Sequence, residues 1–173
     1  MKAIDISRVF IGEKEKRGNA GFFNPKLQLI MTEAGHRAGE AWCCYFCEAV
    51  FCEAAQQAGH EEREKELRKL FSANCVQTFR NFVKSGKYKV SKTPIAGALV
   101  IFQKMKQGLP TSSGHAAIVE DVAPGGDTTH FTTIEGNTNS SGSREGDSVQ
   151  RKKRSTKPMI NGLSVLGFVV IEP

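Results

Sequence analysis

The chain has 173 residues and a mass of 18.9 kDa, with 39% apolar residues and a formal net charge of +6. This length is sufficient for one domain with its own core, which we expect to span 1–173, and the apolar content excludes a disordered or fibrous chain. The longest apolar run, residues 163–171, is too short to cross a bilayer, and the N-terminus lacks the continuous apolar segment of a signal peptide.

Five cysteines occur in the chain, and four of them lie between Cys43 and Cys52. Neighbouring cysteines on one helix do not generally meet the geometry of a disulfide, and an odd count is a poor disulfide framework. We therefore expect reduced thiols and synthesis in a reducing compartment.

The N-terminal half of the chain favours helices. Residues 1–20 are polar and charged, and we expect them to form a segment that wraps loosely around the domain. Phe22-Phe23-Asn24-Pro25 is typical of a helix start, with an Asn cap and Pro at the first helical position, and Gly35 provides a stop. A second, strongly apolar helix is predicted from Gly39 to Ala58.

A charged segment, residues 60–69, begins a further helical stretch that continues to Val83, and Ser72-Ala73-Asn74 can divide it into two helices. After Gly86 the apolar period changes from 3.6 toward 2, which predicts strands near residues 98–103, 115–122, 130–135, 148–154 and 163–171. Turn clusters separate these strands, including one from Asn137 to Gly146. Helices followed by antiparallel strands indicate an α+β fold.

One cysteine stands at a chemically favourable position. Cys43 follows Gly39-Glu40-Ala41-Trp42 at the start of the apolar helix, where free backbone N–H groups and the helix dipole favour a thiolate. A cysteine hydrolase also needs an imidazole within reach of the sulfur and a group that orients the ring. The adjacent Cys44 would point about 100° away on a helix, so only one of the two can face the base.

Among four histidines, His115 is the best candidate base, because Gly114-His115 precedes an apolar strand. His130, also at a strand start, remains the alternative, whereas His36 and His60 are expected at the surface. Glu135 ends the next strand and could accept a hydrogen bond from the imidazole. Asn137 could do the same or help to polarise a carbonyl, although a turn rich in Asn and Gly, taken alone, explains this segment better.

Taken in order, three motifs resemble a known family: Trp42-Cys43 at a helix start, Gly114-His115 before an apolar strand, and Ile134-Glu135-Gly136-Asn137. They resemble the CHAP family of cysteine, histidine-dependent amidohydrolases/peptidases, within the papain-like NlpC-type superfamily of cell-wall hydrolases. The resemblance spans residues 35–168. It implies a papain-like α+β fold, in which N-terminal helices, with the nucleophile on the central one, pack on a C-terminal antiparallel sheet.

The resemblance also implies roles for individual residues. Cys43 would be the nucleophile, and its backbone N–H would form part of the oxyanion hole. His115 would act as general base and then acid, Glu135 would orient His115, and Asn137 would assist. No metal or other cofactor is implied, and the substrate would be a cell-wall amide, cut by a stem-peptide endopeptidase or a muramoyl-alanine amidase.

Two other classes of function are compatible with the residues. A papain-like amidase or acyltransferase could act on a substrate outside the cell wall. A zinc-binding module could use Cys43, Cys47, Cys52 and Cys75, although their helical spacing does not match paired zinc ligands. The basic run Arg151-Lys152-Lys153-Arg154 has no interleaved aromatic residues, so we expect no nucleic-acid partner.

The biological setting follows from the leading hypothesis. A basic surface favours any polyanion, whether nucleic acid, acidic lipid or a cell-wall polymer such as peptidoglycan, and does not choose among them. With no signal peptide expected, the protein would be made in the cytoplasm and would act on the wall or in the periplasm after release by a holin or a secretion system. An immunity protein is a further possible partner, and we expect a monomer.

Overall fold

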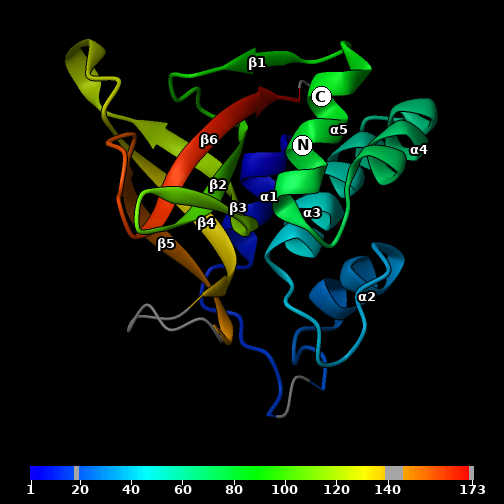
Figure 1. The fold of residues 1–173 in the computed structure, drawn as a ribbon. Coiled ribbons are helices and arrows are strands. Elements are labelled where there is room, and N and C mark those ends of the chain that lie inside the picture. The colour runs from blue at the N-terminus through cyan, green and yellow to red at the C-terminus, as the bar shows by residue number, and fades with distance from the viewer. Residues whose placement is uncertain (18–19, 139–145, 172–173) are drawn as a thin grey trace.

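The computed structural model describes residues 1–17, 20–138 and 146–171. Within these residues, helices precede a six-stranded antiparallel sheet, so the predicted α+β fold is confirmed (Figure 1). The helices are α1 (Ala3–Val9), α2 (Pro25–Glu33), α3 (Cys43–Gln57), α4 (Glu61–Leu70) and α5 (Cys75–Ser85). The strands are β1 (Lys89–Ser91), β2 (Leu99–Lys106), β3 (Leu109–Val122), β4 (His130–Thr138), β5 (Ser148–Ser155) and β6 (Gly162–Val170).

Local capping explains where the helices begin. The Asn24 side chain accepts hydrogen bonds from the first backbone N–H groups of α2, as its position before Pro25 predicts. Asn74 caps α5 by accepting from Gln77 N, and this cap separates α5 from α4. α3 is the central helix, because it contacts α1, α2 and α4 as well as strands β3 and β4.

The N-terminal segment was wrongly expected to be loose. Residues 3–9 form α1, and its apolar side chains Ala3, Ile4 and Ile6 are buried together with Phe10. These residues pack against α3. Burial of this apolar face stabilises α1 and fixes it to the domain, although many of the neighbouring residues in the sequence are charged.

The sheet has the strand order β1-β6-β2-β3-β4-β5. The five predicted strands are present, and the short edge strand β1 was not predicted. β2 and β3 extend further than expected, because Gln107 and Gly108 adopt positive φ angles of 52° and 77° and join them in a tight hairpin. The turn predicted from Asn137 to Gly146 falls mainly on residues 139–145, which lie outside the described residues.

The sheet is strongly curved, and its two faces support two separate cores. Leu99, Ile101 and Ile134 face the helices and join the main core. On the other face, the Phe131 and Phe168 rings meet with their centroids 5.4 Å apart, although β4 and β6 are three strands apart in the sheet. Three strand spacings amount to about 14 Å on a flat sheet, so the sheet must curl around this second core.

Figure 1 shows α2 to α5 gathered on one side of the curved sheet, with β5 at the opposite edge. No helix in the described part of the chain has the length and apolar character that crossing a membrane requires.

The contact across the curled sheet should contribute strongly to stability. Replacing Phe168 by Ala removes a fully buried ring, and we expect a loss of about 3–5 kcal/mol in the free energy of unfolding, measured by urea denaturation. Leu109 is 70% exposed, so Leu109→Ala serves as the control and should change stability by less than about 0.5 kcal/mol. Equal effects of the two substitutions would contradict the assignment of a second core.

Candidate active site

Cys43 is the first residue of α3, and its side chain is largely buried, with 6% exposure. Trp42 immediately precedes it and is anchored by its indole Nε1, which donates to Glu15 Oε2 at 2.9 Å. The Trp42 ring also covers Gly136, where an added Cβ would lie 2.5 Å from the ring. The start of α3 is therefore fixed directly against β4.

His115 and Glu135 meet on neighbouring strands. His115 Nε2 lies 2.9 Å from Glu135 Oε2, and the Glu135 side chain is completely buried. The Cys43 thiol lies beside the imidazole of His115, which influences its charge. Because Nε2 is occupied by the carboxylate, Nδ1 is the ring nitrogen that remains for the sulfur. The three side chains form a continuous chain from sulfur to carboxylate.

The electrostatics of this group favour charge separation. A hydrogen bond with the Cys75 thiol, together with the nearby His115, holds the pKa of Cys43 well below its usual range despite burial. Burial alone would lower the pKa of His115, but the Cys43 thiolate and the Glu135 carboxylate raise it to about 10. Both shifts favour a thiolate beside an imidazolium.

Glu135 has a further partner that the sequence did not reveal. Arg154 on β5 donates from Nε to Oε1 at 2.7 Å and from Nη2 to Oε2 at 2.5 Å. The guanidinium lies over the Phe102 ring, 5.2 Å from its centroid, and Thr133 Oγ1 also donates to Glu135 Oε1. Burial alone would raise the pKa of Glu135, but the hydrogen bonds from His115 and Arg154 lower it well below its usual range.

These contacts produce a balanced set of charges. The ionised forms that these pKa shifts favour give two negative groups, the Cys43 thiolate and the Glu135 carboxylate, and two positive groups, the His115 imidazolium and the Arg154 guanidinium. A buried ionic group is tolerated when every charge is paired and hydrogen-bonded, and this arrangement meets that condition. In the sequence, Arg154 was only the last residue of a basic run, and nothing local identified its partner.

Asn137 does not take part in the same contacts. It lies two residues beyond Glu135 on β4, and its φ angle is positive, at 54°. The hydrogen bonds that join His115, Glu135 and Arg154 do not involve its side chain. Its assisting role therefore remains a prediction.

The competing candidates lie elsewhere. His130 is exposed and pairs with Asp127 at 2.8 Å, five residues along β4 from Glu135, or about 17 Å of extended strand. His60 is exposed, and His36 is half-buried against the rings of Phe22 and Tyr45, so the expectation of a simple surface position is only partly met for His36.

The surroundings of Cys44, Cys47 and Cys52 differ from those of Cys43. Cys44 is buried and hydrogen-bonds with Thr78 Oγ1 at 3.3 Å. Burial raises the pKa of Cys47, and it raises that of Cys52 to about 12, so both stay neutral in the core. Within the residues that the structure describes, no group of three or more His, Cys, Asp or Glu side chains is arranged to hold a metal ion, so the proposed cysteine set does not form a zinc site.

Arg154 should control the reactivity of the thiol through Glu135 and His115. Removing its positive charge by Arg154→Met makes a thiolate less favourable, so the pH midpoint for alkylation of Cys43 by iodoacetamide should rise by about one unit. Peptide mass analysis would identify Cys43 as the labelled residue.

Lys153→Met is the matched control, because Lys153 is an exposed cation on the adjacent position of β5. It should leave the midpoint unchanged. An unchanged midpoint in Arg154→Met would show that the guanidinium has no electrostatic influence on the thiol.

Comparison with known proteins identifies one family. The CHAP domain matches residues 35–137, which are more than half of the chain and include Cys43, His115 and Glu135. No curated protein and no solved structure gives a significant match. The matched segment contains the start of α3 and the adjacent parts of β3 and β4, where the three side chains meet. The chain therefore belongs to the CHAP family of amidohydrolases and peptidases.

Proposed function

We propose that this protein is a peptidoglycan hydrolase that cleaves a cell-wall amide through a cysteine acyl-enzyme. The observation that carries the proposal is the grouping of three side chains: His115 is hydrogen-bonded to Glu135 and lies beside Cys43, whose thiolate is favoured. This arrangement provides the nucleophile, proton carrier and orienting carboxylate that amide hydrolysis requires.

The geometry supports a definite sequence of steps. The Cys43 thiolate attacks the carbonyl carbon, and the negative charge that develops on the carbonyl oxygen faces free N–H groups at the start of α3, including that of Cys43. The His115 imidazolium then protonates the leaving amine from Nδ1, and the C–N bond breaks. In the second stage neutral His115 takes a proton from water, whose oxygen attacks the thioester and releases Cys43.

Glu135 keeps the ring of His115 in the orientation that these steps require. Because its carboxylate binds Nε2, the opposite nitrogen remains directed to the sulfur in both protonation states. Arg154 and Thr133 hold the carboxylate in place. Asn137 is proposed to assist only after the substrate has bound.

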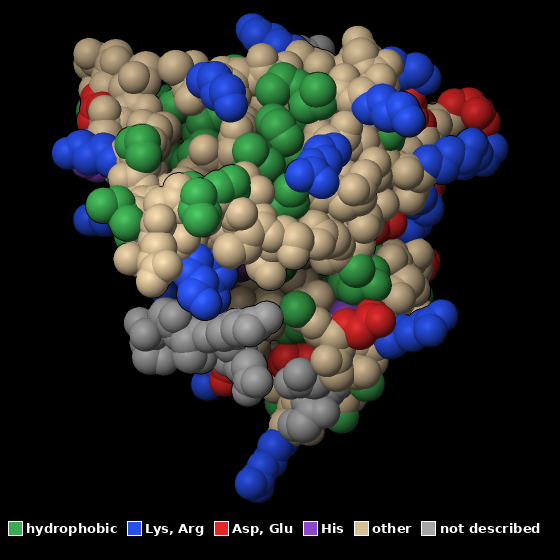
Figure 2. Space-filling view, viewed as in Figure 1, with side chains coloured by type: hydrophobic (Ala, Val, Ile, Leu, Met, Phe, Trp, Pro, Cys, Tyr) green, Lys and Arg blue, Asp and Glu red, His purple; other side chains and the backbone are tan. Residues whose placement is uncertain are grey.

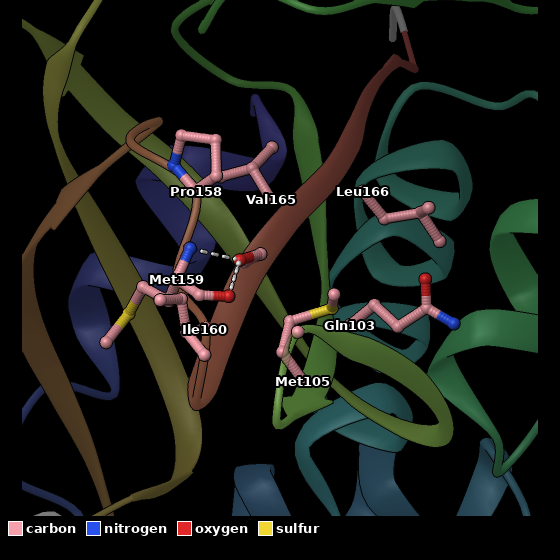
Figure 3. Close-up of a pocket in the computed structure, with 9 residues that line it drawn as sticks. Gln103, Met105, Pro158, Met159, Ile160, Val165 and Leu166 are labelled. Atoms are coloured by element: carbon pink, nitrogen blue, oxygen red, sulfur yellow. Dashed lines mark hydrogen bonds between the residues drawn. The ribbon is translucent and has the colours of Figure 1, made fainter.

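A groove on the sheet, whose lining includes none of Cys43, His115 and Glu135, is proposed to receive part of a peptide-containing substrate. It has a volume of about 390 Å³ and lies between β2 and the segment that leads into β6; its lining includes Gln103, Met105, Met159, Ile160 and Leu166 (Figure 3). Gln103 pairs with Gly114, the residue before His115. Figure 2 shows apolar side chains gathered on this face among separate Lys and Arg side chains, which suits apolar stem-peptide groups on an anionic polymer.

The biological setting is part of the proposal. The enzyme would be made in the cytoplasm and would reach the wall or periplasm through a holin or a secretion system, as an endolysin or an antibacterial effector with an immunity protein. It would act as a monomer and would require neither a metal nor nucleic acid. The alternative is an amidase or acyltransferase that acts on a substrate outside the wall.

Cys43→Ala provides the direct test. It should abolish the clearing of purified sacculi, because the attacking sulfur is lost, while circular dichroism shows an unchanged fold. Cys52→Ala is the control, since Cys52 is also buried on α3 but lies away from His115. Full clearing by Cys43→Ala would overturn the mechanism.

Mass spectrometry of the soluble products tests the substrate. Stem-peptide or muramoyl-amide cleavage products are expected from the wild-type protein. If a small amide is hydrolysed and sacculi remain intact, the alternative function replaces the proposed one.

The pH dependence of kcat/KM should report the thiolate–imidazolium pair. The active form is lost below the lowered pKa of Cys43, and it is lost again when His115 releases its proton near pH 10. We therefore expect a broad bell, with an acid limb well below the usual range of a thiol, in assays of soluble muropeptides. A single rise with the midpoint of an ordinary thiol would instead indicate a neutral Cys43 that His115 deprotonates during attack.

A further inference from the structure

A second thiol lies against the proposed nucleophile. Cys75 Sγ is 3.6 Å from Cys43 Sγ, and both cysteines are free and buried. Each is the first residue of a helix, Cys43 in α3 and Cys75 in α5. Because the mechanism above uses only one sulfur, the close approach of the second sulfur calls for a separate explanation.

The surroundings hold Cys75 firmly in this position. Asn74 caps α5 through its side-chain oxygen, and its Nδ2 donates to Ser112 O at 3.0 Å, which ties the start of α5 to β3. The next residue, Val76, packs against Gly114, where an added Cβ would lie 3.2 Å from Val76 Cγ2. The two sulfurs are therefore brought together by the same strand that carries His115.

Cys75 has two neighbouring thiols, Cys43 and Cys44, and the sulfur of Cys43 is the one in contact with it at 3.6 Å. Cys44 is already hydrogen-bonded to Thr78, and Cys47 and Cys52 are buried along α3. A disulfide requires a sulfur–sulfur distance of about 2.05 Å, so Cys43 and Cys75 must approach by about 1.5 Å. Rotation of the Cys43 and Cys75 side chains about their χ1 angles can provide part of this movement.

We propose that Cys75 is a resolving thiol, which captures peroxide-oxidised Cys43 as an intramolecular disulfide and so protects it from irreversible oxidation. In the first step the Cys43 thiolate attacks hydrogen peroxide. An S–O bond forms, the O–O bond breaks, and hydroxide leaves, so that sulfur is oxidised by two electrons to a sulfenic acid.

In the second step the Cys75 sulfur attacks the sulfenic sulfur of Cys43. The S–S bond forms, the S–O bond breaks, and the departing hydroxide takes the Cys75 proton to form water. In total, two thiols and one peroxide yield one disulfide and two waters. Further oxidation of Cys43 to sulfinic acid is prevented because its sulfur is already bonded.

The consequence for activity rests on the proposed function, because a disulfide at Cys43 removes the nucleophile. The covalent chemistry itself is independent of the substrate. A protein made with reduced thiols would lose activity reversibly in the presence of peroxide and would recover it with a dithiol reductant.

The test treats the full-length protein with hydrogen peroxide and then follows intact mass, free thiols and hydrolysis. The wild-type protein should lose two hydrogen atoms, retain three of its five titratable thiols, and regain both thiols and activity with dithiothreitol. Tryptic peptides that contain Cys43 and Cys75 should be recovered as one cross-linked species.

Variants separate the proposed partner from its neighbours. Cys75→Ser should instead gain oxygen atoms at Cys43 and should not recover with dithiothreitol, whereas Cys44→Ala and Cys52→Ala should form the disulfide as the wild-type protein does. The proposal is wrong if wild-type Cys43 proceeds directly to sulfinic acid, or if Cys75→Ser still forms a reversible disulfide. Because mass and thiol content are measured directly, absence of hydrolytic activity would contradict the proposed function and leave the disulfide result interpretable.

Discussion

The buried carboxylate of Glu135 is the constraint on which the site depends. A charge without solvent costs several kcal/mol unless it is paired and hydrogen-bonded. Here its partners come from its own strand (Thr133), from β3 (His115) and from β5 (Arg154). The register of three neighbouring strands is therefore coupled to one side chain, because a slip by one residue would turn a partner to the other face of the sheet.

The proposed nucleophile, Cys43, is held near this carboxylate by a packing contact. Trp42 precedes Cys43, Gly136 follows Glu135, and the indole covers the glycine so closely that a Cβ would overlap the ring. This apolar contact fixes the start of α3 against the end of β4, and the hydrogen bond from Trp42 to Glu15 holds the indole in place. Hydrogen bonding then needs to determine only the orientation of the His115 ring.

Local patterns in the sequence predicted much of this arrangement. The Asn24-Pro25 helix start, the break between α4 and α5, and the five main strands depend on nearby residues, and the structure agrees with them. The structure also brings Cys43, His115 and Glu135 together, as their order in the motifs predicts.

Features that depend on distant residues were missed. The helix α1 is stabilised by α3, the strand β1 by β6, and the curvature of the sheet by rings on strands that are not adjacent. Arg154 belongs to the same class. Its strand pairs with β4 so that Gln150 is opposite Glu135, and only the twist and curvature of the sheet bring the longer Arg154 side chain to the carboxylate.

The balance of charge within the site has a consequence for how salt should affect the enzyme. Two positive and two negative groups in close contact cancel at a distance, so their field extends little beyond the site, whereas the net charge of +6 belongs to the rest of the surface. Ions screen exposed charges over about 8–10 Å at physiological strength and affect buried pairs much less. Under the proposed function, capture of an anionic polymer and the chemical step would therefore depend on separate sets of charges, and added salt should weaken the first while leaving the second almost unchanged.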